Sequence, residues 1–209
     1  MRKPIQLVGL AALIALTTSC GNVVRQGRSP VYLVIDTLGG APGNSPSTFG
    51  SPLLSDVVVM VTTPAPCSTT TPCPTIFNDL GQVKLRTSLK DVGSTTNPVT
   101  PTTNNDVTIT SYHVKYIRAD GHNVQGVDVP YEFDGALTGT IGVGGALTAG
   151  FELVRHAAKE ESPLVQLASN PNIITTIAQI TFYGKDAVGN DVSVMGQLQV
   201  DFGNFADKS

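Results

Sequence analysis

The chain has 209 residues, of which 41% are apolar and 14% charged, and its net charge is −3 at pH 7. Nucleic acids and anionic lipids are bound by clustered Lys and Arg, so this mildly acidic balance argues against both as partners. The many Gly, Pro, Ser, Thr and Asn residues are typical of an exported β-protein with long turns, and not of a helical enzyme or a disordered acidic tail.

The first 20 residues have the pattern of an export leader. Arg2 and Lys3 supply a positive start, residues 7–16 are apolar, and small polar residues lead to Cys20. Ten residues rise only about 15 Å as a helix, roughly half of a hydrocarbon core. The segment is therefore expected to be a removable signal and not a spanning helix.

The run Leu16-Thr17-Thr18-Ser19-Cys20 resembles the lipobox of bacterial lipoproteins. Ser19 fits that pattern, whereas Thr17 stands where a leucine is commonest. The resemblance implies that residues 1–19 are a signal peptide and that Cys20 starts the mature chain and carries lipid, palmitate included. The alternative is an ordinary secretory signal cut near Ser19, which would leave a free cysteine.

Removal of the leader leaves 190 residues, with 11 basic against 16 acidic side chains and a net charge of −5. Residues 20–30 are expected to be the lipidated cysteine and a short polar tether that reaches at most about 35 Å. Residues 31–205 then form a single domain, since their number suits one, and residues 206–209 are a tail.

The first half of that domain contains three strand signals. Residues 31–38 are rich in β-branched and aromatic side chains, which favour strands. Residues 56–63 hold the apolar run Val57–Val61, short enough for a strand buried on both faces. Residues 81–89 alternate between apolar and polar side chains, which predicts a strand with one face in water.

The longest strand signal covers residues 106–119, and its apolar side chains change parity after Ile109. Such a change predicts a bulge near Thr110 or Ser111, or a strand that passes between two sheets. Further strands are expected at residues 128–133, 137–141, 147–155, 173–185 and 191–202. Turns are expected at 120–123 and at 186–190, where Gly189 suits a left-handed conformation.

Helix is expected only at residues 157–161. It would be one or two turns long, because Pro163 ends it. Three segments, 39–55, 63–74 and 91–105, are longer than ordinary loops. Loops of that length are either functional or mobile.

Residues 180–194, a strand, the turn Asp186–Asn190 and a return strand, resemble the closing hairpin of bacterial immunoglobulin-like and fibronectin type III-like modules. The resemblance implies an all-β fold: an antiparallel immunoglobulin-like β-sandwich with long loops and at most one short helix. The chain departs from the antibody pattern, since it has no Trp. An architecture follows from this resemblance, and no activity.

Two further cysteines, Cys67 and Cys73, lie in a segment rich in Thr and Pro. Outside the cytoplasm, two cysteines this close are expected to form a disulfide, and so small a ring stabilises by about 2 kcal/mol. A metal site would need two more ligands, yet the segment has no His, Asp or Glu. A redox motif would have two intervening residues instead of five.

Signatures of catalysis are absent from the sequence. There is no Gly-x-Ser-x-Gly elbow, and Gly50-Ser51 lies in a proline-flanked loop. His113, His122 and His156 have no spacing that builds a zinc site. We expect His122 in a solvated turn and the other two on strands, so the prediction is no catalytic residue, no metal and no cofactor.

Carboxylates and aromatic residues each allow two interpretations. The carboxylates at expected turns are Asp120, Asp128, Asp134, Asp186 and Asp191. They could hold Ca²⁺, but they lack the spacing of a calcium loop, so backbone turn chemistry is favoured. The aromatic stripes are Tyr112 and Tyr116, together with Val114, and Tyr131 with Phe133. They could stack on a sugar, but a chain without Trp needs them in its core.

Together these features predict a membrane-anchored envelope lipoprotein that acts as a binding or structural module. Its expected partners are the membrane, through the lipid anchor, and an envelope protein or polysaccharide. The alternative is an envelope enzyme or a metal-binding domain with an unrecognised site. Gly21, with no Asp beside the lipidated cysteine, resembles lipoproteins of the outer membrane, on its periplasmic or surface face, if the organism has two membranes.

Overall fold

The computed structural model describes residues 27–142 and 144–205, so the expected leader, Cys20, most of the tether and the 206–209 tail lie outside the described residues. The strands are β1 (Val31–Ala41), β2 (Leu53–Asp56), β3 (Val59–Val61), β4 (Cys73–Thr75), β5 (Asp79–Leu89), β6 (Val107–Ile117), β7 (Phe133–Ile141), β8 (Ala146–Val154), β9 (Ile174–Asp186) and β10 (Asp191–Gly203). Among the described residues, short helical elements are η1 (Thr103–Asn105), α3 (His156–Lys159) and η2 (Leu164–Ser169). The prediction of a β-rich fold is confirmed, whereas the expectation of at most one short helix is wrong, since the chain forms helical turns at each of these places. Within these residues, no helix has the length and apolarity needed to cross a bilayer.

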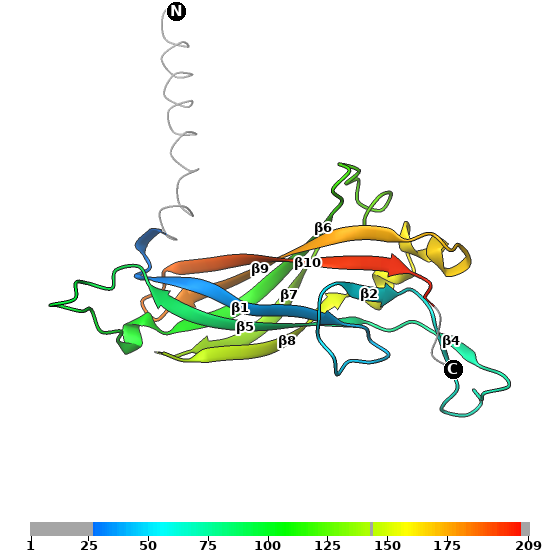
Figure 1. Cartoon of the computed structure of the whole chain (residues 1–209), viewed down its shortest axis with the longest axis horizontal. Helices are drawn as coiled ribbons and strands as arrows, with labels where there is room; N and C mark the ends of the chain where they lie inside the picture. Colours follow the sequence, from blue (N-terminus) through cyan, green and yellow to red (C-terminus); the bar gives the residue numbers. More distant parts are fainter. Residues whose placement is uncertain (1–26, 143, 206–209) are drawn as a thin grey trace, which may run out of the picture.

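The strands form two main sheets that face each other (Figure 1). One has the order β1-β5-β8, and the other, curled like half of a barrel, has the order β2-β10-β9-β6-β7. At their borders β1 lies beside β10 and β7 lies beside β8. β2 pairs with β10 in parallel, so the prediction of a wholly antiparallel fold is wrong at this pair. The chain leaves the first sheet after β1 and joins the border of the second, where it runs alongside the last strand.

Strand β6 contains the predicted bulge. Its register with both β7 and β9 shifts between Ile109 and Ser111. The shift lets Ile109 and Tyr112 both point into the core, where both are buried. One extra residue in the strand thus reconciles the two parities seen in the sequence.

Two predicted strands have other conformations. Residues 56–63 do not form one buried strand, because the chain leaves the large sheet after Asp56 and β3 pairs with β4 in a separate small hairpin. Residues 128–132 form no strand either: a turn at residues 126–128, in which the N–H groups of Val127 and Asp128 donate to the carbonyl of Val124, leads to irregular chain before β7. The loop expected at residues 39–55 covers only residues 42–52, since β1 extends to Ala41 and β2 begins at Leu53.

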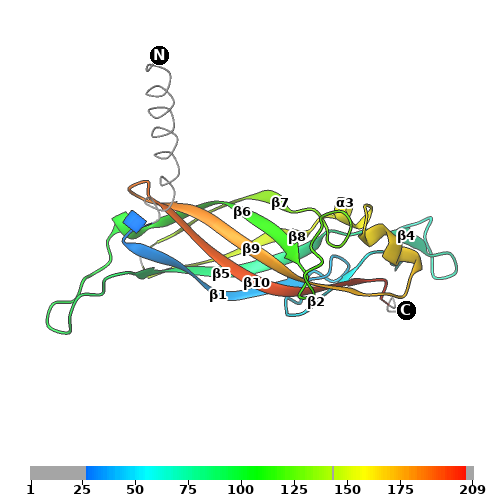
Figure 2. The ribbon, with the colours of Figure 1, turned by 90° about the horizontal axis from the view of Figure 1, so that it is seen from above.

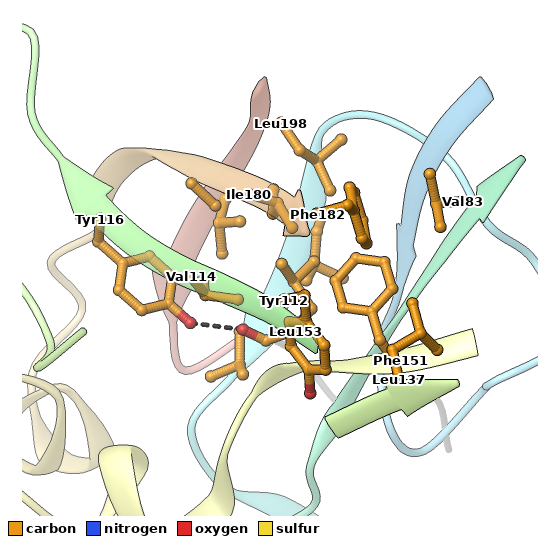
Figure 3. Packing of buried hydrophobic residues seen from close by; sticks show 14 of the residues in the cluster. Val83, Tyr112, Val114, Tyr116, Leu137, Phe151, Leu153, Ile180, Phe182 and Leu198 are labelled. Atoms are coloured by element: carbon orange, nitrogen blue, oxygen red, sulfur yellow. Dashed lines mark hydrogen bonds between the residues drawn. The ribbon is translucent and has the colours of Figure 1, made fainter. Parts of the chain in front are cut away.

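The core lies between the sheets and is built around an aromatic cluster (Figure 3). The ring centroid of Tyr112 lies 5.1 Å from that of Phe151, which in turn lies 5.3 Å from that of Phe182. The hydroxyl of buried Tyr116 donates a hydrogen bond to the carbonyl of Leu153. These rings fill the core as predicted for the first stripe, whereas Tyr131 of the second stripe is exposed.

The strand directions give the domain two ends (Figures 1 and 2). At the tether end, β1 begins after residues 27–30, and this end also holds the segment 90–106 and the 187–190 turn. At the distal end lie the segments 42–52, 57–78, 118–132 and 155–173 and the last described residues. Four connecting segments therefore gather at the end opposite the entry of the chain.

Candidate functional site

The two cysteines predicted to pair lie at disulfide distance, with their sulfur atoms 2.02 Å apart. They close the loop between β3 and β4, at the distal end of the domain (Figure 1). Cys67 and Cys73 thus constrain a hairpin that belongs to neither large sheet. This position agrees with a disulfide that pins a loop and does not join the two sheets.

The three histidines lie in three separate places. His113 on β6 has its Nδ1 atom 2.9 Å from Asp134 and its Nε2 atom 3.7 Å from Glu132. His122 lies in the predicted turn, 3.5 Å from Asp120.

His156 is not on a strand as expected. It is the first residue of α3, and its backbone N–H donates to Asn78 Oδ1 at 2.7 Å, which joins the start of this short helix to the residue before β5. Over residues 27–142 and 144–205, no group of three or more His, Cys, Asp and Glu side chains is placed to hold a metal ion.

The five aspartates do not gather into a group of three or more within the part of the chain that the structure describes, and most of them hold backbone turns or local contacts. Asp120 accepts a hydrogen bond from the N–H of His122, and Asp128 accepts one from the N–H of Val124. Asp191 instead pairs with Lys185 at 2.6 Å, on neighbouring strands. These contacts are the turn and surface chemistry favoured by the sequence.

Asp186 organises the turn between β9 and β10. Its carboxylate accepts hydrogen bonds from the N–H of Val188 and from both the backbone and the side chain of Asn190. Burial alone would raise its pKa, but these donors, together with the Ser29 hydroxyl, outweigh burial and lower it. The carboxylate therefore ties the turn to the residues just before β1, and Gly189, with φ +89°, completes the turn in the predicted left-handed conformation.

A buried ionic cluster near the distal end was not predicted from the sequence. Lys159 of α3 lies 2.9 Å from Asp79 of β5, and each side chain is only 1% exposed. The Ser55 hydroxyl donates to the same carboxylate at 2.6 Å, and the N–H of Gly43 donates to its other oxygen at 2.9 Å. Lys159 also donates to the carbonyl of Asp56 at 2.8 Å.

This Lys159–Asp79 cluster connects α3, β5, β2 and the loop after β1. Burial raises the pKa of Asp79, against the opposing effect of the Lys159 ammonium and the hydrogen bonds from Ser55 and Gly43. Because its side chains are buried, the cluster can hold the distal segments together but cannot contact a substrate. A lysine in the run Ala157-Ala158-Lys159-Glu160-Glu161 looks like part of a solvated helix face, so no pattern marks it as buried.

Two hollows stand out among the described residues. One, of about 160 Å³, lies near the tether end and is lined by Val31, Tyr32, Leu33, Lys90, Val192 and Ser193. The other, of about 310 Å³, lies at the distal end and is lined by residues 168–171 and Asn204. Enclosed ligand sites usually have about 300–1,000 Å³, and the larger hollow reaches only the lower limit of that range. The distal hollow and the surrounding loops are the candidate site, suited to surface recognition through polar groups.

No protein-family model matches the chain, and no curated protein matches it.

Proposed function

We propose that the chain is a lipoprotein of the bacterial cell envelope, held in the membrane by lipid on Cys20, and that its domain binds or organises an envelope protein or polysaccharide without catalysing a reaction. Two acyl chains suffice for stable anchoring, at about 0.8 kcal/mol per buried CH₂ group. Beside the leader pattern, the support is a β-scaffold with four connecting segments at the end opposite the entry of the chain.

We further propose that the architecture is immunoglobulin-like, and the strand order supports this. In variable-type immunoglobulin domains one sheet contains neighbouring strands A, B and E, and the other contains G, F, C and C′. The orders β1-β5-β8 and β10-β9-β6-β7 follow the same sequence of connections. The parallel strand β2 then occupies the place beside the last strand, where a second segment of strand A would lie. A measured structure with a different strand order would contradict this assignment.

The binding proposal depends on one observation: the entry of the chain and the distal segments lie at opposite ends of the domain. The chain enters β1 at the tether end, while the disulfide-closed hairpin and the segments 42–52, 118–132 and 155–173 lie at the distal end (Figure 2). A domain anchored at Cys20 would present these distal segments away from the membrane. The Lys159–Asp79 cluster beneath them supplies the rigidity that recognition by loops requires.

Photo-crosslinking in intact cells tests this arrangement with two matched positions. Val127, in the distal segment 118–132, is 65% exposed, and Val188, in the turn at the tether end, is 67% exposed. We expect a photo-crosslinking amino acid at position 127 to capture an envelope partner and the same probe at position 188 to capture none. Capture at position 188 alone would contradict recognition by the distal end.

The competing function is an envelope enzyme or a metal-binding domain. A purified domain that hydrolyses an ester, peptide or glycoside, and loses that activity when one His or Asp is changed, would replace the binding proposal. His113 is the residue to change first, because Asp134 and Glu132 lie at either side of its ring.

A further inference from the structure

The segment that leaves β5 at the tether end folds back on itself as a small hairpin, residues 91–99. The N–H of Val99 donates to the carbonyl of Val92 at 3.1 Å, and Gly93 forms a β-bridge with Pro98. Ser94 and Asn97 close the turn through backbone hydrogen bonds in both directions. This pairing brings two valines side by side, and both are exposed, Val92 to 67%.

The chemistry of the hairpin suits contact with the boundary between lipid headgroups and acyl chains. Asp91 at the base of the hairpin is charged, but residues 92–105 contain no charged side chain, so no ionised group beyond that base would have to leave water. Several backbone N–H and C=O groups of the hairpin are already paired within it, which lowers the cost of a less polar environment. Its exposed valines are otherwise left in water.

The position of the hairpin points to the same surface. Lys90, directly before it, donates from Nζ to the carbonyl of Gly27 at 3.5 Å, so the hairpin starts beside the entry of the chain. Cys20 lies seven residues before Gly27, and at about 3.5 Å per residue the connecting chain spans at most about 25 Å. A lipid on Cys20 therefore keeps the tether end within that distance of the bilayer.

We propose that the 91–99 hairpin docks on the bilayer that holds the anchor, with Val92 and Val99 in the interfacial region. This inference rests on the proposed lipidation of Cys20. Two valines bind lipid weakly by themselves, but the anchor makes the contact intramolecular and raises the local concentration of lipid. Because Asp91 is the hairpin's charged residue and no Lys or Arg lies within it, docking does not depend on anionic headgroups. The contact would direct the long axis, and with it the distal end, away from the membrane.

Fluorescence quenching tests the contact, because the chain contains no tryptophan and one introduced indole reports its own position. The lipidated full chain with Val92→Trp is reconstituted into phosphatidylcholine vesicles with brominated or ordinary acyl chains. Val127→Trp, at a distal position of almost equal exposure, is the matched control. We expect brominated chains to reduce emission from position 92 by at least about twofold and to leave emission from position 127 within about a tenth of its value.

Flotation of the same vesicles separates the two proposals. A chain that floats with the vesicles but shows equal quenching at positions 92 and 127 overturns the docking of the hairpin and leaves the anchor in place. A chain that does not float overturns the anchor, and the hairpin contact with it. Insertion is further supported if Val92→Asp, together with Val99→Trp as the reporter, abolishes quenching while flotation is unchanged.

Discussion

At the scale of single residues, the Lys159–Asp79 cluster is the strongest departure from the ordinary placement of charged side chains. Lysine and aspartate are almost never fully buried unless they are paired, and here each is paired and also hydrogen-bonded to a second group. The attraction between the two charges must offset the desolvation of both. Removing one partner is therefore far more damaging than the loss of one hydrogen bond.

We predict that Lys159→Met lowers the free energy of unfolding by about 3–5 kcal/mol, because it leaves the Asp79 carboxylate buried without its counter-ion. Urea denaturation followed by circular dichroism measures the loss. Lys185→Met is the matched control: it removes an exposed ion pair with Asp191 and should cost at most about 1 kcal/mol. Adding Asp79→Asn to Lys159→Met should recover part of the stability. Equal losses of unfolding free energy for the two lysine variants would show that the buried pair does not stabilise the fold.

A second residue-scale prediction concerns pH. The pKa of Asp186 is lower in the folded chain than its ordinary value of 3.8, so the folded state binds this proton less tightly than the unfolded state. Its stabilising contribution is then fully present above pH 3.8 and is lost as the pH falls through the lower, folded pKa. We expect Asp186→Asn to cost about 1–3 kcal/mol at pH 6, with the difference from the wild-type chain shrinking below pH 3.8. Denaturation curves between pH 6 and 2.5 would contradict this if the difference grew toward acid.

At the scale of elements, the hairpin formed by β3 and β4 lies outside the two large sheets. Its strands pair with each other in a sheet of their own, and the Cys67–Cys73 link closes the loop between them. The alternation in β5 and the bulge in β6, by contrast, are built into the large sheets and control which side chains reach the core. The strands of the large sheets therefore contribute more to the fold than this hairpin does.

We predict that replacing both cysteines, Cys67→Ser with Cys73→Ser, lowers stability by at most about 2 kcal/mol and leaves the sandwich folded. The reason is that the closed ring is small and lies outside both large sheets. Hydrogen exchange should accelerate in residues 62–75 and stay unchanged in β6 and β9. The oxidised wild-type chain is the reference, and faster exchange throughout β9 would mean that the hairpin supports the core after all.

At the scale of the whole molecule, the arrangement of the two ends determines how the proposed lipid anchor would orient the domain. A short connection to β1 would hold one end near the membrane and leave the other free, as Figure 1 makes visible along the long axis. Segments 42–52 and 57–78 contain no charged side chain, so polar contacts made by these two segments should depend only weakly on salt.

We predict that Cys20→Ser moves the protein from the membrane fraction to the soluble fraction, because no acyl chain is then attached. Immunoblotting of fractionated cells measures the distribution, and thermal unfolding of the released variant should match that of the domain with its anchor. A Cys20→Ser variant that still sediments with membranes would contradict anchoring through this residue.

Local sequence determined much of this protein. The strands β1, β5, β8, β9 and β10, the bulge in β6, the Asp186 turn and the proximity of Cys67 to Cys73 all follow from alternation, turn chemistry and short separation along the chain. Each of these depends on neighbours within a few residues, so a linear pattern contains the information.

Only the tertiary structure decided the rest. The apolar run 57–61 looks like one buried strand. However, β2, the strand before it in the large sheet, ends at Asp56, and the chain then leaves that sheet to form the β3–β4 hairpin. Lys159 and Asp79 are 80 positions apart, and nothing near either one marks its burial. The parallel pairing of β2 with β10 likewise joins the two halves of the chain. Such contacts arise from how the sheets pack, because the partner that compensates a buried charge or completes a sheet border is brought close only by the fold.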